Sequence, residues 1–219
     1  MVLGGVSERI VSPPMSQATP IVYVVDDDLS VRESLELLVR HEGWHPETFE
    51  SAQEFLSRPH VLVPSCLILD ITMPGINGLE LQKRVAAERS DMPIIFITGY
   101  GDVPTTVQAM KAGAVEFLTK PFSDAVLLSA IKSAMQRSVA ALRVEAEIRA
   151  LQARYAALSR REREVMGLVV RGRLNKQVGF ELGISEITVK AHRGQVMRKM
   201  DAGSLADLVN IAAKLGMAR

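Results

Sequence analysis

Two apolar segments of the sequence each end in aspartate: residues 21–25 are followed by Asp26, Asp27 and Asp28, and residues 66–69 by Asp70. Continuous β-branched and aliphatic runs are typical of buried parallel strands, and ligands of open α/β sheets bind beyond the carboxyl ends of such strands. Because carboxylates held close together repel one another, we expect a hard divalent cation among them, Mg²⁺ first. For Asp28 alone, the pattern favours the simpler role of capping the following helix.

A hydroxyl and an ammonium group follow two further apolar segments. Residues 93–97 lead into Thr98, and residues 115–118 lead into Thr119 and Lys120. A carboxylate nucleophile, a metal ion, a hydroxyl and a lysine are the groups needed to take up a phosphoryl group and neutralise its oxygens. Taken singly, Thr98 fits a turn and Lys120 a solvated charge, so only the combination indicates a site.

Helical segments alternate with these strand-like runs. Ser30 with Glu33, and Ser51 with Glu54, have the spacing of a helix N-terminus in which a side chain caps the first amides. The alternation predicts an α/β domain with a five-stranded, parallel, doubly wound sheet. Right-handed crossovers would place both acidic loops and the Thr98 loop around one crevice.

Residues 20–137 resemble the receiver domains of two-component response regulators. The segments that carry the resemblance are residues 24–28, 69–75, 97–99 and 117–122. The resemblance implies a flavodoxin-like strand order, 2-1-3-4-5, and a phosphoryl group accepted by Asp70 from a sensor histidine kinase. It also implies Mg²⁺, or alternatively Mn²⁺, on Asp27, Asp70 and the backbone carbonyl of Thr72, with Asp26 reaching the metal mostly through water.

Three other residues match the switch positions of that family. Thr98 matches the switch hydroxyl, Lys120 the phosphate-pairing lysine and Phe117 the aromatic switch position. The phenyl ring of Phe117 can swing between rotamers as a tyrosine would, but it has no hydroxyl to hold either one. The Lys120-Pro121 peptide matches a cis bond of the family.

Length and composition are compatible with two modest domains of opposite charge. The chain has 219 residues, of which 47% are hydrophobic. Residues 20–138 contain 10 Lys and Arg against 16 Asp and Glu, whereas residues 139–219 contain 15 against 8. A basic domain is typical of nucleic-acid binding, although it also fits an acidic protein partner or a solvated surface.

Other features predict a soluble, cytoplasmic protein. The single cysteine, Cys66, lies in a predicted core strand, which excludes a disulfide framework and indicates a reducing compartment. No apolar stretch approaches the roughly 20 residues of a membrane span. Residues 1–19 lack the pattern of a signal peptide and are predicted to be a disordered leader.

A long helix is expected from Asp124 to about Leu158, because this segment lacks glycine and proline and is rich in helix-forming residues. Residues 138–157 are therefore predicted to be a helical linker. Apolar residues recur along it with heptad spacing: Val144, Ile148, Leu151, Tyr155 and Leu158. This stripe fits either a short coiled-coil seam or a face packed on a neighbouring domain.

Residues 158–219 are predicted to form a small all-α domain of four helices. Helix starts are indicated at Ser159 with Glu162, at Asn175, at Ser185, and at Ser204 with Asp207. The middle pair of helices has the form of a helix-turn-helix, although glycine-containing helical hairpins are also common in plain bundles.

This part of the chain resembles the DNA-binding domain of LuxR-type regulators, through residues 158–165, 175–178 and 184–193. The resemblance implies base contacts from Lys190, Ala191 and Gly194, and phosphate contacts from Lys176, Arg193 and Arg198. Gly194 offers no side chain for base readout. In the same helix, Ile187, Val189, Val196 and Met200 are predicted to lie in the core.

The two resemblances together imply a phosphorylation-dependent transcriptional regulator of the FixJ/NarL type, which is not an enzyme. Its partners would be a sensor histidine kinase, promoter double-stranded DNA, RNA polymerase and a second copy of the chain. Dimerisation on phosphorylation would use either the receiver face around residues 104–118 or the linker helix.

Two other hypotheses remain open at this point. An Mg²⁺-dependent phosphohydrolase would use Asp70 as nucleophile, but Thr72 stands where such enzymes place the acid/base aspartate. The basic domain could instead bind only protein, or the regulator could act without phosphorylation.

Overall fold

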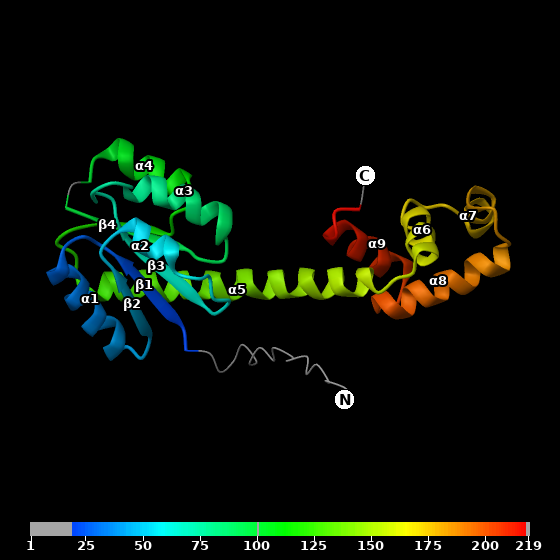
Figure 1. The fold of residues 1–219 in the computed structure, drawn as a ribbon, viewed down its shortest axis with the longest axis horizontal. Helices are drawn as coiled ribbons and strands as arrows, with labels where there is room; N and C mark the ends of the chain where they lie inside the picture. Colours follow the sequence, from blue (N-terminus) through cyan, green and yellow to red (C-terminus); the bar gives the residue numbers. More distant parts are fainter. Residues whose placement is uncertain (1–18, 100, 218–219) are drawn as a thin grey trace, which may run out of the picture. The chain divides into compact units, whose positions relative to one another are not determined.

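The computed structural model describes residues 19–99 and 101–217, and Figure 1 follows their helices and strands along the chain. The chain divides into two compact units, with the boundary between Leu142 and Arg143, inside helix α5 (Asp124–Ala156). The predicted leader lies outside the described residues, apart from Thr19. The two units are described separately.

The first unit contains a five-stranded sheet in which all neighbouring strands are parallel. Its order is β2-β1-β3-β4-β5, which confirms the predicted doubly wound, flavodoxin-like topology. The strands are β1 (Ile21–Val25), β2 (His45–Phe49), β3 (Ser65–Asp70), β4 (Ile94–Thr98) and β5 (Glu116–Thr119). Because all five run in the same direction, their carboxyl ends meet at one edge of the sheet.

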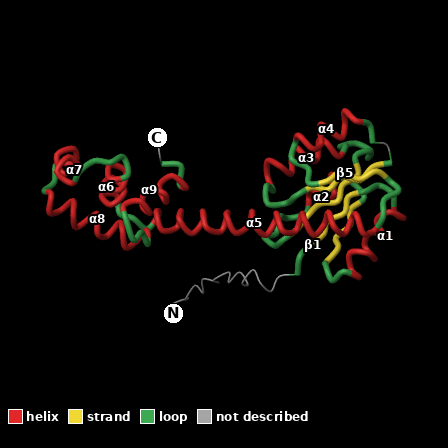
Figure 2. The backbone as a smooth tube through the Cα atoms, turned by 180° about the vertical axis from the view of Figure 1, so that it is seen from behind, coloured by secondary structure: helices red, strands yellow, loops and turns green. Residues whose placement is uncertain are grey.

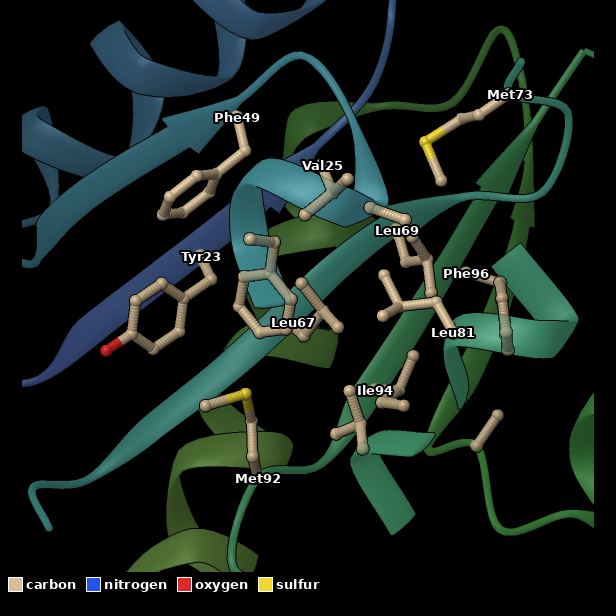
Figure 3. Close-up of a cluster of buried hydrophobic side chains, with 14 of the residues drawn as sticks. Tyr23, Val25, Phe49, Leu67, Leu69, Met73, Leu81, Met92, Ile94 and Phe96 are labelled. Atoms are coloured by element: carbon tan, nitrogen blue, oxygen red, sulfur yellow. The ribbon is translucent and has the colours of Figure 1, made fainter. Parts of the chain in front are cut away.

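Helices cover both faces of this sheet, as Figure 2 shows. They are α1 (Leu29–His41), α2 (Ala52–Ser57), α3 (Gly78–Glu88), α4 (Val103–Lys111) and the first part of α5. Alternate residues of β1 point to opposite faces. Tyr23 and Val25 join the core under α2, α3 and α4, part of which is drawn in Figure 3, whereas Val22 and Val24 join the core under α1 and α5.

Local capping decides where the first helices begin. The Asp28 carboxylate accepts a hydrogen bond from the Ser30 backbone N–H at 2.8 Å, so α1 begins after Asp28. The predicted start at Ser30 is therefore wrong, and the cap predicted for Asp28 is confirmed. Ser51 caps α2 as predicted, through a bond from the Glu54 N–H.

Two smaller expectations for the first unit are confirmed. The Lys120-Pro121 peptide is cis. Cys66 is fully buried in β3, and burial raises the pKa of its thiol to about 12, as expected for a small apolar core residue.

Within its described residues, the second unit consists of helices joined by short turns. Its helices are the end of α5, then α6 (Arg160–Val169), α7 (Asn175–Leu182), α8 (Glu186–Met200) and α9 (Leu205–Lys214). The caps predicted at Ser159, Ser185 and Ser204 are confirmed. The cap predicted at Asn175 is wrong: Leu174 holds that position, and its N–H donates to the Gln177 side chain at 2.9 Å.

The apolar stripe of α5 does not behave as one continuous seam. Leu158 is buried in the core of the second unit with Tyr155 packed against it, whereas Val144 is 56% exposed. Ion pairs Lys214–Glu147 and Arg154–Asp201, at 2.6 and 3.1 Å, also join α5 to the rest of this unit. The C-terminal end of the stripe is therefore a face packed on the adjoining domain. Across residues 19–99 and 101–217, no helix combines the length and the apolar character that a membrane crossing requires.

Candidate functional site

The acidic residues predicted from the sequence meet at the carboxyl edge of the sheet. Asp26 and Asp27 follow β1, and Asp70 ends the neighbouring strand β3. One carboxylate oxygen from each of these three residues lies within 4.8 Å of the other two. Asp28 is not in this group, because its carboxylate is used to cap α1.

Hydrogen bonds from the backbone orient two of the carboxylates. Asp26 Oδ1 accepts from the Asp28 N–H at 2.9 Å, and Asp70 Oδ1 accepts from the Thr72 N–H at 3.1 Å. Asp26 is fully buried, Asp70 is 7% exposed and Asp27 is exposed. The site therefore has a fixed interior and one side open to solvent.

Lys120 joins the two buried carboxylates. Its Nζ donates to Asp26 Oδ2 at 2.7 Å and to Asp70 Oδ2 at 3.1 Å. Burial raises the pKa of Asp26, while the hydrogen bonds from Lys120 and the Asp28 N–H act to lower it. Burial acts to lower the pKa of Lys120, but the hydrogen bonds and charges of Asp26 and Asp70 outweigh it and raise that pKa. Lys120 and the Asp28 N–H thus favour the ionised form of Asp26, against the effect of burial.

Thr98 and Phe117 lie on the strands beside the acidic group. Thr98 is the buried last residue of β4, whose Ile97 pairs with Asp70. Phe117, in β5, is half-buried with its ring centroid 6.3 Å from that of Phe96. The predicted switch residues therefore occupy strands on the same side of the acidic group.

Two residues that support the acidic group were not predicted. Arg32, on α1, donates to the backbone carbonyl of Asp26 at 2.7 Å. Gly78 begins α3 so close to β3 that a Cβ there would lie 2.4 Å from the Asp70 carbonyl oxygen. An arginine six residues after an aspartate and a glycine at a helix start are too common to have indicated these contacts.

The acidic group suits a hard cation. Its three side chains offer only oxygen atoms, without histidine or cysteine, and oxygen ligands are those that Mg²⁺ and Mn²⁺ bind. Lys120 contacts two of the three carboxylates but brings only one positive charge to the acidic group. The structure thus shows an acidic pocket whose composition fits a divalent metal.

In the second unit, a tight turn sets α7 against α8. Gly183 ends α7 in the left-handed conformation, with a φ of 65°. Gly179 lies against this turn, where a Cβ would lie 2.7 Å from the Ile184 carbonyl oxygen. The side chain of Ser185 then caps α8 by accepting from the Thr188 N–H. This is the geometry of a helix-turn-helix.

The predicted DNA-contacting residues fall into two groups. Lys190, Ala191, Gly194 and Arg198 are exposed on one face of α8, and Lys176 is exposed at the start of α7. Arg193 is half-buried instead, and its guanidinium donates to the Asn175 side chain at 3.3 Å. In this structure Arg193 joins α8 to α7.

One core prediction for α8 is wrong. Val189, Val196 and Met200 are buried as expected, but Ile187 is 80% exposed. Two residues along a helix correspond to roughly 200° of rotation, so Ile187 faces away from the side on which Val189 is buried. The apolar side chain of Ile187 suggested a buried position, but its place in the helix directs it to solvent.

Comparisons with known proteins match both units. The response regulator receiver domain family matches residues 22–132, and the luxR family of bacterial regulatory proteins matches residues 156–212. Nodulation protein W of Bradyrhizobium diazoefficiens is 48% identical over 197 residues, which cover 90% of this chain and 87% of that protein. Transcriptional regulatory protein FixJ of the same organism is 44% identical over 196 residues, covering 90% and 96%. The solved structure of the response regulator StyR has a TM-score of 0.76 and 46% identity, covering 90% of this chain and all of that one.

Proposed function

This chain belongs to the two-component response regulators that carry a LuxR-type DNA-binding domain, a non-enzymatic family that regulates transcription, and on that premise we propose that Asp70 is its phosphoryl acceptor. The receiver domain implies a sensor kinase as partner, and the second domain implies DNA binding. We further propose residues 20–137 as the receiver, 138–157 as the linker and 158–219 as the DNA-binding domain. Since promoter DNA is cytoplasmic in bacteria, the proposed place of action is the cytoplasm.

The position of Asp70 carries the proposal. Its carboxylate ends a central strand, is held by the Thr72 N–H, and lies 3.1 Å from the Lys120 ammonium. A carboxylate oxygen of Asp70 forms a bond to phosphorus as the P–N bond of a kinase phosphohistidine breaks. The imidazole nitrogen keeps the electron pair of that bond and takes up a proton. Lys120 is placed to pair with an oxygen of the transferred group, and Thr98 to donate to another.

The proposed metal ligands are Asp26, Asp27, Asp70 and the backbone carbonyl of Thr72. When bound, Mg²⁺ or Mn²⁺ would neutralise negative charge on the phosphoryl oxygens. The hydrogen bonds from Lys120 and the Asp28 N–H favour the ionised form of Asp26. The fit of an all-oxygen donor set supports this proposal.

The test of the acceptor is labelling by a small phosphodonor with Mg²⁺ present. We expect the wild type to be labelled and Asp70→Asn to remain unlabelled on a gel that separates phosphorylated protein. Asp28→Asn is the matched control, because Asn can also cap α1, and it should label like the wild type. Undiminished labelling of Asp70→Asn would refute the acceptor assignment.

Dimerisation on phosphorylation is the proposed link between the two domains. Thr98 and Phe117 would transmit the change to the α4-β5 face, which carries apolar side chains that are 41–76% exposed: Val103, Val107 and Met110. The linker helix is the alternative surface, where Val144 is 56% exposed. A dimer would place one DNA-binding domain on each of two half-sites and would therefore bind DNA more tightly than a monomer. The bound dimer would act on RNA polymerase.

Sedimentation with and without beryllofluoride, a phosphoryl mimic, tests this link. We expect the wild type to dimerise when beryllofluoride and Mg²⁺ are added. Val107→Asp should abolish the dimer if the α4-β5 face is used, and Val144→Asp should do so if the linker is used. A dimer that persists in both variants would contradict both proposed dimer interfaces.

DNA binding is proposed to use Lys190, Ala191 and Gly194 against bases, with Lys176, Arg193 and Arg198 against phosphates. The exposed face of α8 supports the first group. A gel shift of promoter DNA should weaken with rising salt and be lost in Lys190→Ala. Lys214→Ala, which removes a lysine of α9, is the control, and binding untouched by Lys190→Ala contradicts the assignment of α8.

A further inference from the structure

The exposed side chain of Ile187 lies on the same face of α8 as the proposed base-reading residues. Ile187 precedes Lys190 by three residues, Ala191 by four and Gly194 by seven. Residues at these spacings share one face of an α-helix. The buried residues Val189, Val196 and Met200 form the opposite side. Single exposed isoleucines are common on protein surfaces. Ile187, however, lies at the N-terminal end of the face of α8 that is proposed to read DNA.

Ile187 is also the first residue of that face along α8. It is the second residue of α8, and the N-terminal residues of a recognition helix are those that contact base edges in the major groove. The first turn is held in place by Ser185, whose Oγ accepts from the Thr188 N–H at 3.1 Å and lies 2.8 Å from the Thr188 hydroxyl. A β-branched side chain in a helix has few rotamers to lose on binding.

The chemistry of the surrounding surface limits what Ile187 can recognise. The neighbouring Lys190 ammonium lies 3.2 Å from the Glu186 carboxylate, so the charges on both sides of Ile187 compensate one another. Ala191 and Gly194 add only small apolar surface, and a Cβ built on Gly194 would meet open space. The apolar group that a major groove presents is the C5-methyl of thymine.

We infer that Ile187 is a specificity-determining residue, whose side chain contacts the C5-methyl group of a thymine in each half-site. The inference rests on the DNA binding proposed above and adds a base-reading residue to it. Because Lys190 is one helical turn further along the same face, the thymine read by Ile187 lies beside the base pair read by Lys190.

The test removes the thymine methyl group from the DNA and the Ile187 side chain from the protein, separately. The probe is a duplex that the full-length wild type, with Mg²⁺ and beryllofluoride, enriches from a random library. Each thymine is replaced in turn by deoxyuridine, which lacks only the C5-methyl. We expect wild-type affinity to fall roughly three- to tenfold at one position of the half-site. Ile187→Ala should bind the unmodified duplex more weakly and show no further loss at that position.

Two variants sharpen this comparison. Ile187→Val keeps a branched apolar side chain and should retain part of the deoxyuridine effect. Phe180→Ala is the matched control, because Phe180 is 90% exposed but lies on α7, and this variant should keep the whole effect. Circular dichroism verifies that each variant is folded, which is expected because both substituted side chains are exposed.

The outcomes distinguish the inference from the function on which it rests. If a duplex is enriched but deoxyuridine has equal effects on the wild type and Ile187→Ala at every position, the inference is wrong. Unchanged DNA affinity of Ile187→Ala overturns it too, and would point to a protein contact for this side chain. If the folded wild type enriches no duplex, the proposed DNA binding fails and the inference fails with it.

Discussion

The proposed phosphoryl acceptor of the receiver domain and the proposed base-reading face of the DNA-binding domain are exposed to very different degrees. In the receiver, Asp26 is fully buried, Asp70 is 7% exposed, and the Lys120 ammonium contacts both. On α8, the Ile187 residue is 80% exposed and the Lys190 side chain 62%. The group proposed to form a bond to phosphorus is held by its neighbours, whereas the groups proposed to read DNA are free to reach it.

This difference has a consequence for stability. Charges that are buried and paired belong to the packing of the receiver, so removing one should affect folding as well as function. Exposed side chains of α8 contribute little to folding, and their loss should affect DNA binding alone. The single tryptophan, Trp44, packs against the receiver core, so its fluorescence follows that domain in the full-length chain.

The largest effect on stability is expected for Lys120→Met. The substitution leaves Asp26 and Asp70 without their cation, and removal of one partner from a buried ion pair is strongly destabilising. Since the Lys120 side chain is 25% exposed, we expect a loss of about 2–3 kcal/mol in the free energy of unfolding. Urea unfolding followed by Trp44 fluorescence, with divalent ions chelated, measures it.

Lys132→Met is the control for that prediction. Lys132 lies 3.5 Å from Glu42 on the surface of the same domain, with its side chain 60% exposed. The loss should be at most about 0.5 kcal/mol, because solvent screens such a pair. Equal losses in the two variants would show that burial of the lysine does not increase its contribution to the stability of the receiver domain.

Gly179→Ala should give the next largest effect, in the DNA-binding domain. Alanine favours a helix by roughly 1 kcal/mol over glycine. The added Cβ would however lie 2.7 Å from the Ile184 carbonyl oxygen, which belongs to backbone and cannot easily move. We expect a net loss of about 1–3 kcal/mol, measured by urea unfolding followed by circular dichroism. A stabilised variant would contradict the tight packing of α7 on the turn.

Gly194→Ala should stabilise the protein, by less than Gly179→Ala destabilises it. This glycine is on the exposed face of α8, and a Cβ there meets nothing within 4 Å. The helix preference of alanine should therefore appear as a gain of about 0.5–1 kcal/mol in the same experiment. A loss of stability would mean that the exposed face of α8 is packed against something in the free protein.

The smallest effect on stability is expected for Glu162→Gln, and it should depend on pH. The Lys199 side chain and the Ser159 N–H donate to this carboxylate and lower its pKa below the usual 4.5. A lowered folded-state pKa contributes stability above the unfolded pKa, and that stability is lost as the pH falls through the folded pKa. The wild type should therefore be more stable than Glu162→Gln at pH 7, with the difference shrinking below about pH 4.5. A difference that is constant from pH 7 to pH 3.5 would contradict the proposed role of the charge.

Helix starts were the part of the fold that local sequence predicted best. Ser51, Ser159, Ser185 and Ser204 cap helices as expected, because such a bond spans only three residues of the chain. The two wrong starts, at Ser30 and Asn175, arose where a second residue nearby could hold the first turn. Asp28 caps α1, and Gln177 reaches back to the Leu174 N–H.

The amino-acid sequence by itself determined the two domains, their opposite charges, and the gathering of Asp26, Asp27 and Asp70 at one sheet edge. These follow from short-range patterns and from the parallel direction of the strands. Only the tertiary structure decided that Lys120 bridges two of those carboxylates and that Arg32 holds the Asp26 carbonyl. It also decided that Ile187 faces outward. The contacts of Lys120 and Arg32 depend on how segments far apart in the chain pack together. The outward position of Ile187 depends on which face of α8 packs on its neighbours, and residue type alone settles neither.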